Sequence, residues 1–162
     1  MGSTPLSAGD ELGDCMFYQL LGGALVSLFN FSIHVAMAGL VVVVSRHIAG
    51  RTDDLHVFLR LTAIQLVTVI VLAAAHVLEI AVWAVFYRWA GFEIKGANEF
   101  EFAFENYTAL GYGDAVAVDG WRLIGPITAL NGLLLIGVSV AVVFEIMKLV
   151  DIQIGRRRKH SR

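Results

Sequence analysis

The sequence contains few charged residues, one cysteine and two prolines. Charged residues make up 16% of its 162 positions and apolar residues 57%, against about 25% and about 45–50% in an average soluble domain. The single cysteine, Cys15, excludes a disulfide within the chain and a cysteine-based metal cluster. The scarcity of proline excludes a Pro-rich disordered chain. The composition therefore favours a membrane protein of a single domain.

No basic residue precedes the first apolar segment. Residues 1–16 are small, polar and acidic, whereas a signal peptide needs a basic start and a short apolar stretch. The apolar segment that follows, residues 17–45, contains no Asp, Glu, Lys or Arg over 29 positions. A helix needs about 20 apolar residues to cross the hydrocarbon core, so we expect a membrane helix here.

Two further apolar segments, residues 61–87 and 123–150, also predict membrane helices. A polar connection at residues 46–60 separates the first two segments, and a basic tail, residues 151–162, follows the third.

The basic residues are distributed unevenly, which predicts the orientation. Nine of the twelve lie in the connection or towards the C-terminal end of the chain. They are Arg46, Arg51, Arg60, Lys148, Arg156, Arg157, Arg158, Lys159 and Arg162. Because basic residues mark the cytoplasmic face, we expect a multi-pass protein of the cell membrane with a cytoplasmic connection and tail. Residues 1–16 and 91–120 would then lie outside. The tail is expected to contact anionic lipid headgroups, and no nucleic acid.

Between the second and third apolar segments, an aromatic stretch (FEFAFENY) leads into TALGYGD. About ten residues are too few to span a bilayer, so this stretch predicts a re-entrant helix at residues 99–107. Gly111 and Gly113 can adopt positive φ without steric cost. A strand of residues with alternating handedness can turn successive carbonyl groups to one side, and rings of carbonyls can replace the hydration shell of a cation. One chain supplies one strand, so such a site needs several copies around an axis.

The sequence FENYTALGYGD, residues 104–114, resembles the pore signature of the potassium channel family. This resemblance implies a pore domain at residues 61–150, made of an outer helix, a pore helix, a filter and an inner helix. Residues 17–45 would be an additional membrane helix. The implied fold is an all-α membrane protein with three transmembrane helices, a re-entrant pore helix and a filter loop, assembled as a homotetramer. The implied function is passive, potassium-selective conduction, with no enzymatic activity and no cofactor besides K⁺ ions in the filter.

The resemblance assigns the filter to a continuous run of residues. They are Thr108, Ala109, Leu110, Gly111, Tyr112, Gly113 and Asp114. It implies that K⁺ is held by the backbone carbonyls of Ala109, Leu110, Gly111 and Tyr112. The family usually has Thr where this chain has Ala109, so the innermost ion site loses a ring of hydroxyl oxygens. A weakly selective cation channel is therefore one alternative, and a non-conducting membrane subunit that binds partners is another.

Several other residues are candidates around the filter. Glu105 and Asp114 would support it as a hydrogen-bonded carboxyl pair that shares a proton, or both would be solvated. Gly132 would be a hinge of the inner helix, or a point of close helix packing. Leu133, Ile136, Val140 and Phe144 share one helix face and would line the cavity and gate, or pack against neighbours. Glu145 would form an acidic ring at the inner mouth, or pair with Lys148.

Polar residues inside the other two helices need partners. His76 and Glu79 share a face of the second helix, and Asn30 and His34 of the first helix are candidate partners. Ionisable groups at membrane depth are costly and usually face protein or water. We expect hydrogen bonds between helices here, with a proton-sensitive element as the alternative reading. The first helix lacks regularly spaced arginines, which argues against a voltage sensor.

Overall fold

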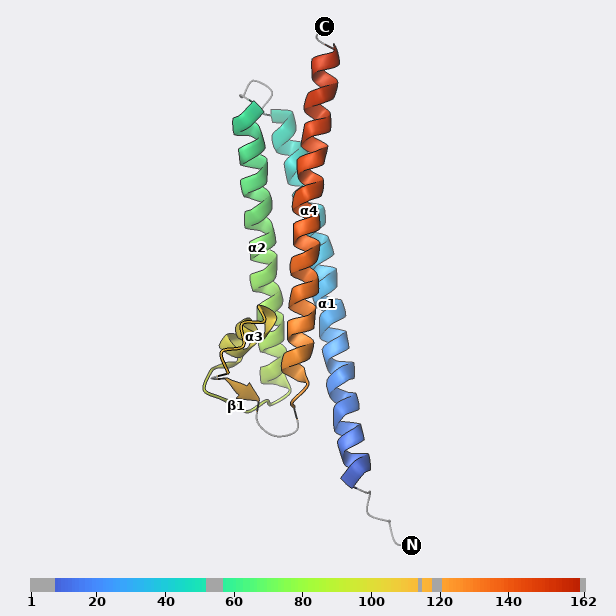
Figure 1. Ribbon diagram of the computed structural model, residues 1–162, viewed down its shortest axis with the longest axis vertical. Helices are drawn as coiled ribbons and strands as arrows, with labels where there is room; N and C mark the ends of the chain where they lie inside the picture. Colours follow the sequence, from blue (N-terminus) through green and yellow to red (C-terminus); the bar gives the residue numbers. More distant parts are fainter. Residues whose placement is uncertain (1–7, 52–56, 114, 118–120, 161–162) are drawn as a thin grey trace. The chain divides into compact units, whose positions relative to one another are not determined.

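The computed structural model describes residues 8–51, 57–113, 115–117 and 121–160. Within these residues, three long helices and one short helix dominate (Figure 1): α1 (Ala8–Arg51), α2 (Val57–Trp89), α3 (Glu99–Tyr107) and α4 (Ile124–His160). Two short strands, β1 (Ile94–Lys95) and β2 (Val116–Ala117), flank α3 in the sequence and pair antiparallel, with Ile94 opposite Ala117. The sequence did not predict this strand pair, which joins the segments before and after α3.

The three long helices are long and apolar enough to cross a membrane, over Met16–Ile48, Phe58–Trp89 and Ile124–Leu149. Three membrane-span candidates with a short helix between the last two are thereby confirmed. The connection predicted at residues 46–60 is shorter in the structure, because residues 46–51 and 57–60 are helical. An apolar run marks the hydrocarbon layer and does not mark the helix end, since the backbone hydrogen bonds of a helix are internal and can continue into water.

The short helix α3 occupies the predicted residues, and its N-terminus explains its start. Asn98 is the N-cap: its side-chain oxygen accepts hydrogen bonds from the backbone N–H groups of Phe100 (3.0 Å) and Glu101 (2.9 Å). The Glu101 carboxylate accepts in return from the Asn98 N–H at 3.0 Å. This capping box satisfies N–H groups that have no partner inside the helix.

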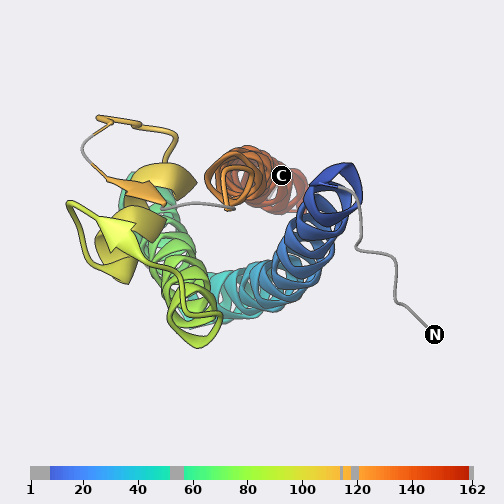
Figure 2. The same cartoon turned by 90° about the horizontal axis from the view of Figure 1, so that it is seen from below.

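The contacts divide the chain into two compact units, and α1, α2 and α4 contribute to both. The first unit takes the described residues of Met1–Asn30 and Glu79–Leu133, and the second those of Phe31–Leu78 and Leu134–Arg162. In the first unit, α3 and the strand pair lie beside the C-terminal part of α2 (Figures 1 and 2). This unit therefore contains the described residues of the predicted filter, 108–113.

Aromatic side chains fix α3 against α2 in the first unit. The ring of Tyr87, which is fully buried, lies 5.3 Å from the rings of Phe92 and Phe102 and 5.8 Å from that of Trp83, between centroids. Large buried aromatic surfaces of this kind dominate local packing energies. The segment on either side of α3 is held as well, because Phe92 packs edge-to-face on Trp121 at 4.2 Å.

The additional helix α1 approaches α4 closely in the same unit. A Cβ atom built on Gly23 would lie 2.7 Å from Cγ2 of Ile127, so the missing side chain permits this approach. The Gln19 side chain also accepts a hydrogen bond from the Leu123 N–H at 3.0 Å, one residue before α4 begins. The N-terminal half of α1 is thus packed on the helix that follows the filter segment.

In the second unit the core is apolar and combines all three long helices. Val41 of α1, Ile64 and Leu72 of α2, and Ile146 of α4 are buried together. Leucine and β-branched residues at helical spacing make this contact, as expected for neighbouring apolar helices.

Candidate functional site

The C-terminus of α3 leads directly into the predicted filter, and its hydrogen bonds define how the chain turns there. The Ala109 N–H donates to the Asn106 carbonyl at 2.9 Å, and the Leu110 N–H donates to the Glu105 carbonyl at 3.0 Å. With Thr108 as the C-cap, this pair of bonds is a Schellman motif. The motif requires a left-handed residue just after the cap, and Ala109 takes that place with φ +56°.

The backbone after this motif alternates in handedness. Gly111 and Gly113 have φ values of +55° and +83°, whereas Leu110 and Tyr112, which precede them, are outside the positive-φ region. Ala109 is the one non-glycine residue with positive φ in the part of the chain that the structure describes. The glycine spacing predicted positive φ at Gly111 and Gly113, and the structure extends the alternation back to Ala109.

The side chains of Leu110 and Tyr112 in this segment are exposed in a single chain. Tyr112 is 70% exposed and Leu110 is 52% exposed. Asp114 lies outside the described residues, so the predicted Glu105–Asp114 pair stays a prediction. Glu105 itself is half-buried, and its carbonyl accepts from Leu110 and from the Thr108 hydroxyl at 3.3 Å.

A buried carboxylate lies behind the filter segment. Tyr107, the last residue of α3, donates its hydroxyl to Oε2 of Glu79 on α2, and both side chains are fully buried. Burial first, and then the Glu79 carboxylate, raise the pKa of Tyr107 above its ordinary value. The phenol therefore keeps its proton and acts as the donor.

Polar side chains from the long helices surround this contact. The Asn30 side-chain amide of α1 donates to the Glu79 backbone carbonyl and to Oδ1 of Asn131 on α4, both at 3.2 Å. Trp83 of α2 donates to the same Asn131 oxygen at 2.9 Å. All of these side chains are buried. Hydrogen bonds between buried side chains of this kind hold membrane helices together.

Gly132 provides a close contact between α4 and the end of α3. A Cβ atom built on Gly132 would overlap the backbone oxygen of Tyr107 and lie 2.8 Å from its carbonyl carbon. Gly125 faces the Asn106 side chain, with 2.6 Å from a built Cβ to Oδ1. The structure gives Gly132 the packing role that the sequence analysis held open, and its role as a hinge stays a prediction.

The predicted cavity-lining residues lie on the exposed face of α4 in a single chain. Leu133, Val140 and Phe144 are more than half exposed, and Ile136 is 36% exposed. Glu145 and Lys148 are exposed as well. The buried residues on the opposite face of α4 are Ile124, Thr128, Asn131, Leu135, Ser139 and Ile146. The predicted cavity-lining face is therefore available to an ion pathway or to neighbouring copies.

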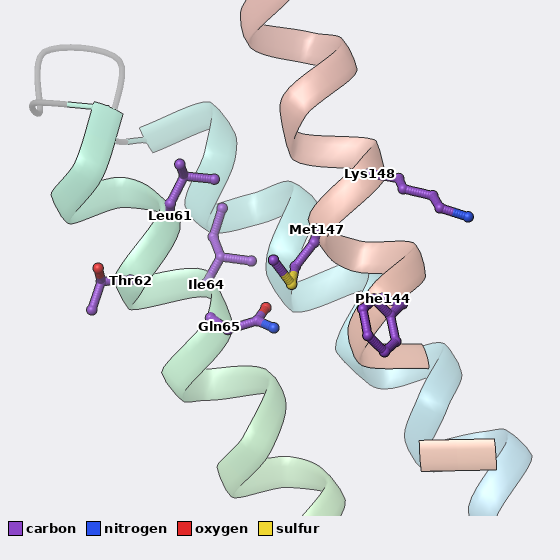
Figure 3. Close-up of a pocket in the computed structure, with 7 residues that line it drawn as sticks. All are labelled: Leu61, Thr62, Ile64, Gln65, Phe144, Met147 and Lys148. Atoms are coloured by element: carbon purple, nitrogen blue, oxygen red, sulfur yellow. The ribbon is translucent and has the colours of Figure 1, made fainter. Parts of the chain in front are cut away.

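Phe144 also lines a cavity in the second unit (Figure 3). The cavity has a volume of about 530 Å³ and lies between α2 and α4. Its lining residues are Leu61, Thr62, Ile64, Gln65, Phe144, Met147 and Lys148. Phe144 thus contributes to this cavity as well as to the exposed face of α4.

The histidines predicted to meet do so in the second unit. The rings of His34 on α1 and His76 on α2 lie 5.3 Å apart. Ser139 of α4 lies 2.9 Å from Nε2 of His76 and 3.4 Å from Nε2 of His34. This is the interhelical hydrogen bonding that the sequence favoured.

The Glu79–Tyr107 pair was the contact that sequence reasoning missed, although a signal for it existed. Glu79 is the one charged residue between Arg60 and Arg88, and an acid at that depth calls for a named partner. The sequence does not identify the Tyr107 hydroxyl as that partner. The acceptor lies 28 positions away.

The capping box of α3 allows a direct test. Asn98→Ala removes the acceptor for two N–H groups and is expected to lower the stability of the protein by about 1 kcal/mol. Thermal unfolding in detergent measures this loss. Glu99→Ala is the matched control in the same turn, and an equal loss from both variants would contradict the role of the cap.

The sequence matches the Ion_trans_2 family, described as an ion channel, over residues 66–148. Comparison with curated proteins and with solved structures gave no match. The matched residues include most of α2, all of α3, the segment with alternating handedness and α4 as far as Lys148. They form just over half of the chain and leave α1 outside. The chain is therefore a multi-pass membrane protein that belongs to this ion channel family, not to a family of enzymes, and carries its pore domain at residues 66–148.

Proposed function

We propose that the chain forms a potassium-selective channel. In this proposal, K⁺ passes down its gradient through the backbone carbonyls of Ala109, Leu110, Gly111 and Tyr112. The observation that carries the proposal is the alternation of positive and non-positive φ over residues 109–113. Such an alternation lets successive carbonyl oxygens face one side, where they can replace the hydration shell of an ion.

The helix before the filter adds an electrostatic argument. The C-terminal end of a helix carries a partial negative charge of about half an elementary charge. α3 ends at Tyr107, directly before the filter, so its negative end lies beside the segment through which the cations would pass. Its acidic residues Glu99, Glu101 and Glu105 would add to the attraction for cations at the outer mouth.

A homotetramer is part of the proposal. A single strand of carbonyls cannot surround an ion, and the family resemblance implies four copies around the axis. The exposure of Leu110 and Tyr112 supports this assembly, because neighbouring copies would cover side chains that a single chain leaves bare.

The orientation follows from charge. We propose that residues 46–60 and the basic tail lie in the cytoplasm, where the tail would contact anionic lipids. The N-terminus and the filter would then lie at the outer side. A cysteine introduced at Lys95, between α2 and α3, would be labelled from outside the cell by a membrane-impermeant thiol reagent in a Cys15→Ala background.

Ion flux through purified protein in liposomes tests the function. We expect K⁺ flux well above Na⁺ flux in matched gradients, and its loss in Gly111→Ala. Gly111 has φ +55°, and apart from its two chain neighbours no heavy atom of the described residues lies within 4 Å of a Cβ built there. The substitution therefore strains the filter backbone by about 1–2 kcal/mol in each copy without a clash within the chain. Selective K⁺ flux that persists in Gly111→Ala would contradict this filter.

A weakly selective cation channel is the second candidate, and Ala109 favours it. The methyl side chain of Ala109 offers no oxygen at the innermost ion site, where the family usually places a threonine hydroxyl. Equal K⁺ and Na⁺ flux through the wild type would establish this second function in place of the first. No flux from an intact oligomer that also binds no K⁺ would favour a non-conducting subunit.

A further inference from the structure

Tyr107 lies at the point where the filter begins, so its position determines where the carbonyl groups start. It is the last residue of α3, and the Schellman motif through Thr108, Ala109 and Leu110 follows it without a flexible linker. A shift of Tyr107 would therefore move the filter backbone with it. Ion selectivity in a carbonyl site depends on the placement of these oxygens.

Two contacts hold Tyr107 from different helices. Its backbone carbonyl rests against Gly132 of α4, where no side chain would fit. Its hydroxyl donates to the Glu79 carboxylate of α2. The main chain and the side chain of one residue are thus both fixed within the first unit.

Glu79 is itself held by hydrogen bonds that connect α2 to α1 and α4. Its backbone carbonyl accepts from Asn30 of α1, and Asn30 also bonds to Asn131, which accepts from Trp83. Glu79 has no exposed surface. A buried ionisable group at such a depth is costly and usually serves a function.

We propose that Glu79 is a positioning residue for the filter, which sets the K⁺ preference by holding the hydroxyl of Tyr107. This inference rests on the proposed function. It assigns to α1, through Asn30, a share in the same support, although α1 lies outside the matched pore domain.

The structure offers a matched control for the loss of a buried phenol hydroxyl. Tyr87 of α2 is also fully buried, and its hydroxyl pairs with the Thr128 hydroxyl of α4. That contact joins two long helices without reaching the end of α3. Tyr87→Phe should therefore affect stability without moving the filter.

The variants are chosen so that no buried charge is left without its donor. Tyr107→Phe alone would leave the Glu79 carboxylate without the phenol and could prevent folding. Glu79→Gln keeps an acceptor for the Tyr107 hydroxyl but removes the charge. Comparison of Glu79→Gln with the double variant Glu79→Gln/Tyr107→Phe then isolates the hydroxyl. Glu79→Gln/Tyr87→Phe is the control.

Calorimetric titration of the purified oligomer with K⁺ and with Na⁺ is the test, because binding needs no opening stimulus. The ratio of K⁺ to Na⁺ affinity measured for Glu79→Gln is the reference for both double variants. The Glu79→Gln/Tyr107→Phe variant should lower that ratio by about tenfold, as the loss of a supporting partner does at other ion sites, with a melting temperature close to that of the control.

Three results would count against this proposal, and they can be told apart. If the wild type is selective and the affinity ratio is unchanged in Glu79→Gln/Tyr107→Phe, the positioning role of Glu79 is wrong but the proposed function stands. If the ratio falls equally in the control Glu79→Gln/Tyr87→Phe, the positioning role is also wrong, because a general loss of packing explains both results. A wild type without K⁺ preference overturns the proposed function, and the inference with it.

Discussion

Gly132→Ala is expected to destabilise the protein and to abolish its ion flux. The added Cβ would overlap the Tyr107 carbonyl oxygen and lie 2.8 Å from the carbonyl carbon. These are backbone atoms held by the end of α3, so they cannot move aside as the tip of a flexible side chain can. Overpacking of this kind costs typically about 1–3 kcal/mol, and relief would require α3 and the filter to shift.

Gly137→Ala on the same helix is the matched control. Apart from its chain neighbours and the adjoining backbone of α4, no heavy atom in the described part of the chain lies within 4 Å of a Cβ built on Gly137. Melting temperature and liposome flux measure both variants. We expect Gly132→Ala to melt roughly 5–10 °C lower than the wild type and Gly137→Ala to change little. A Gly132→Ala protein with wild-type stability and altered flux would contradict the packing role and support a hinge.

The secondary structure was predictable where it depends on apolar runs and turn residues that are close together in the sequence. Uninterrupted apolar segments of sufficient length gave the three spans, and the aromatic stretch gave the short helix at residues 99–107. The alternation at Gly111 and Gly113 was predictable as well, because glycine adopts positive φ more readily than any other residue. Each of these features is set within a few neighbouring residues.

The support behind the filter was not predictable, because it depends on how separate helices pack. The contact of Glu79 with Tyr107 and that of Gly132 with the Tyr107 backbone join residues at least 25 positions apart. The sequence indicated that Glu79 needed a partner but not which one. Positive φ at Ala109 was also unforeseen, since alanine rarely adopts it and only the hydrogen bonds that end α3 require it.

Ala109→Thr is expected to raise the ratio of K⁺ to Na⁺ affinity while it lowers stability. The hydroxyl would add a ring of oxygens at the innermost ion site of the proposed tetramer. A contact between a hydroxyl and a charged group contributes about 1.5–3 kcal/mol, and every 1.4 kcal/mol corresponds to about a tenfold change in affinity. The threonine is β-branched, however, and Ala109 has φ +56°, a region that is strongly unfavourable for such side chains.

Ala109→Gly separates these two effects. Glycine adopts φ +56° without the penalty of about 1–2 kcal/mol that an L-residue carries there, so this variant should melt higher than the wild type. It adds no oxygen and loosens the segment, so its affinity ratio should be no higher than that of the wild type. The three proteins should therefore rank in opposite orders in the two measurements. The affinity ratio from calorimetric titration should be highest for Ala109→Thr, whereas the melting temperature should be highest for Ala109→Gly. If Ala109→Thr leaves the ratio unchanged, the missing hydroxyl ring does not limit selectivity, and the carbonyls of residues 109–112 alone account for whatever K⁺ preference the wild type has.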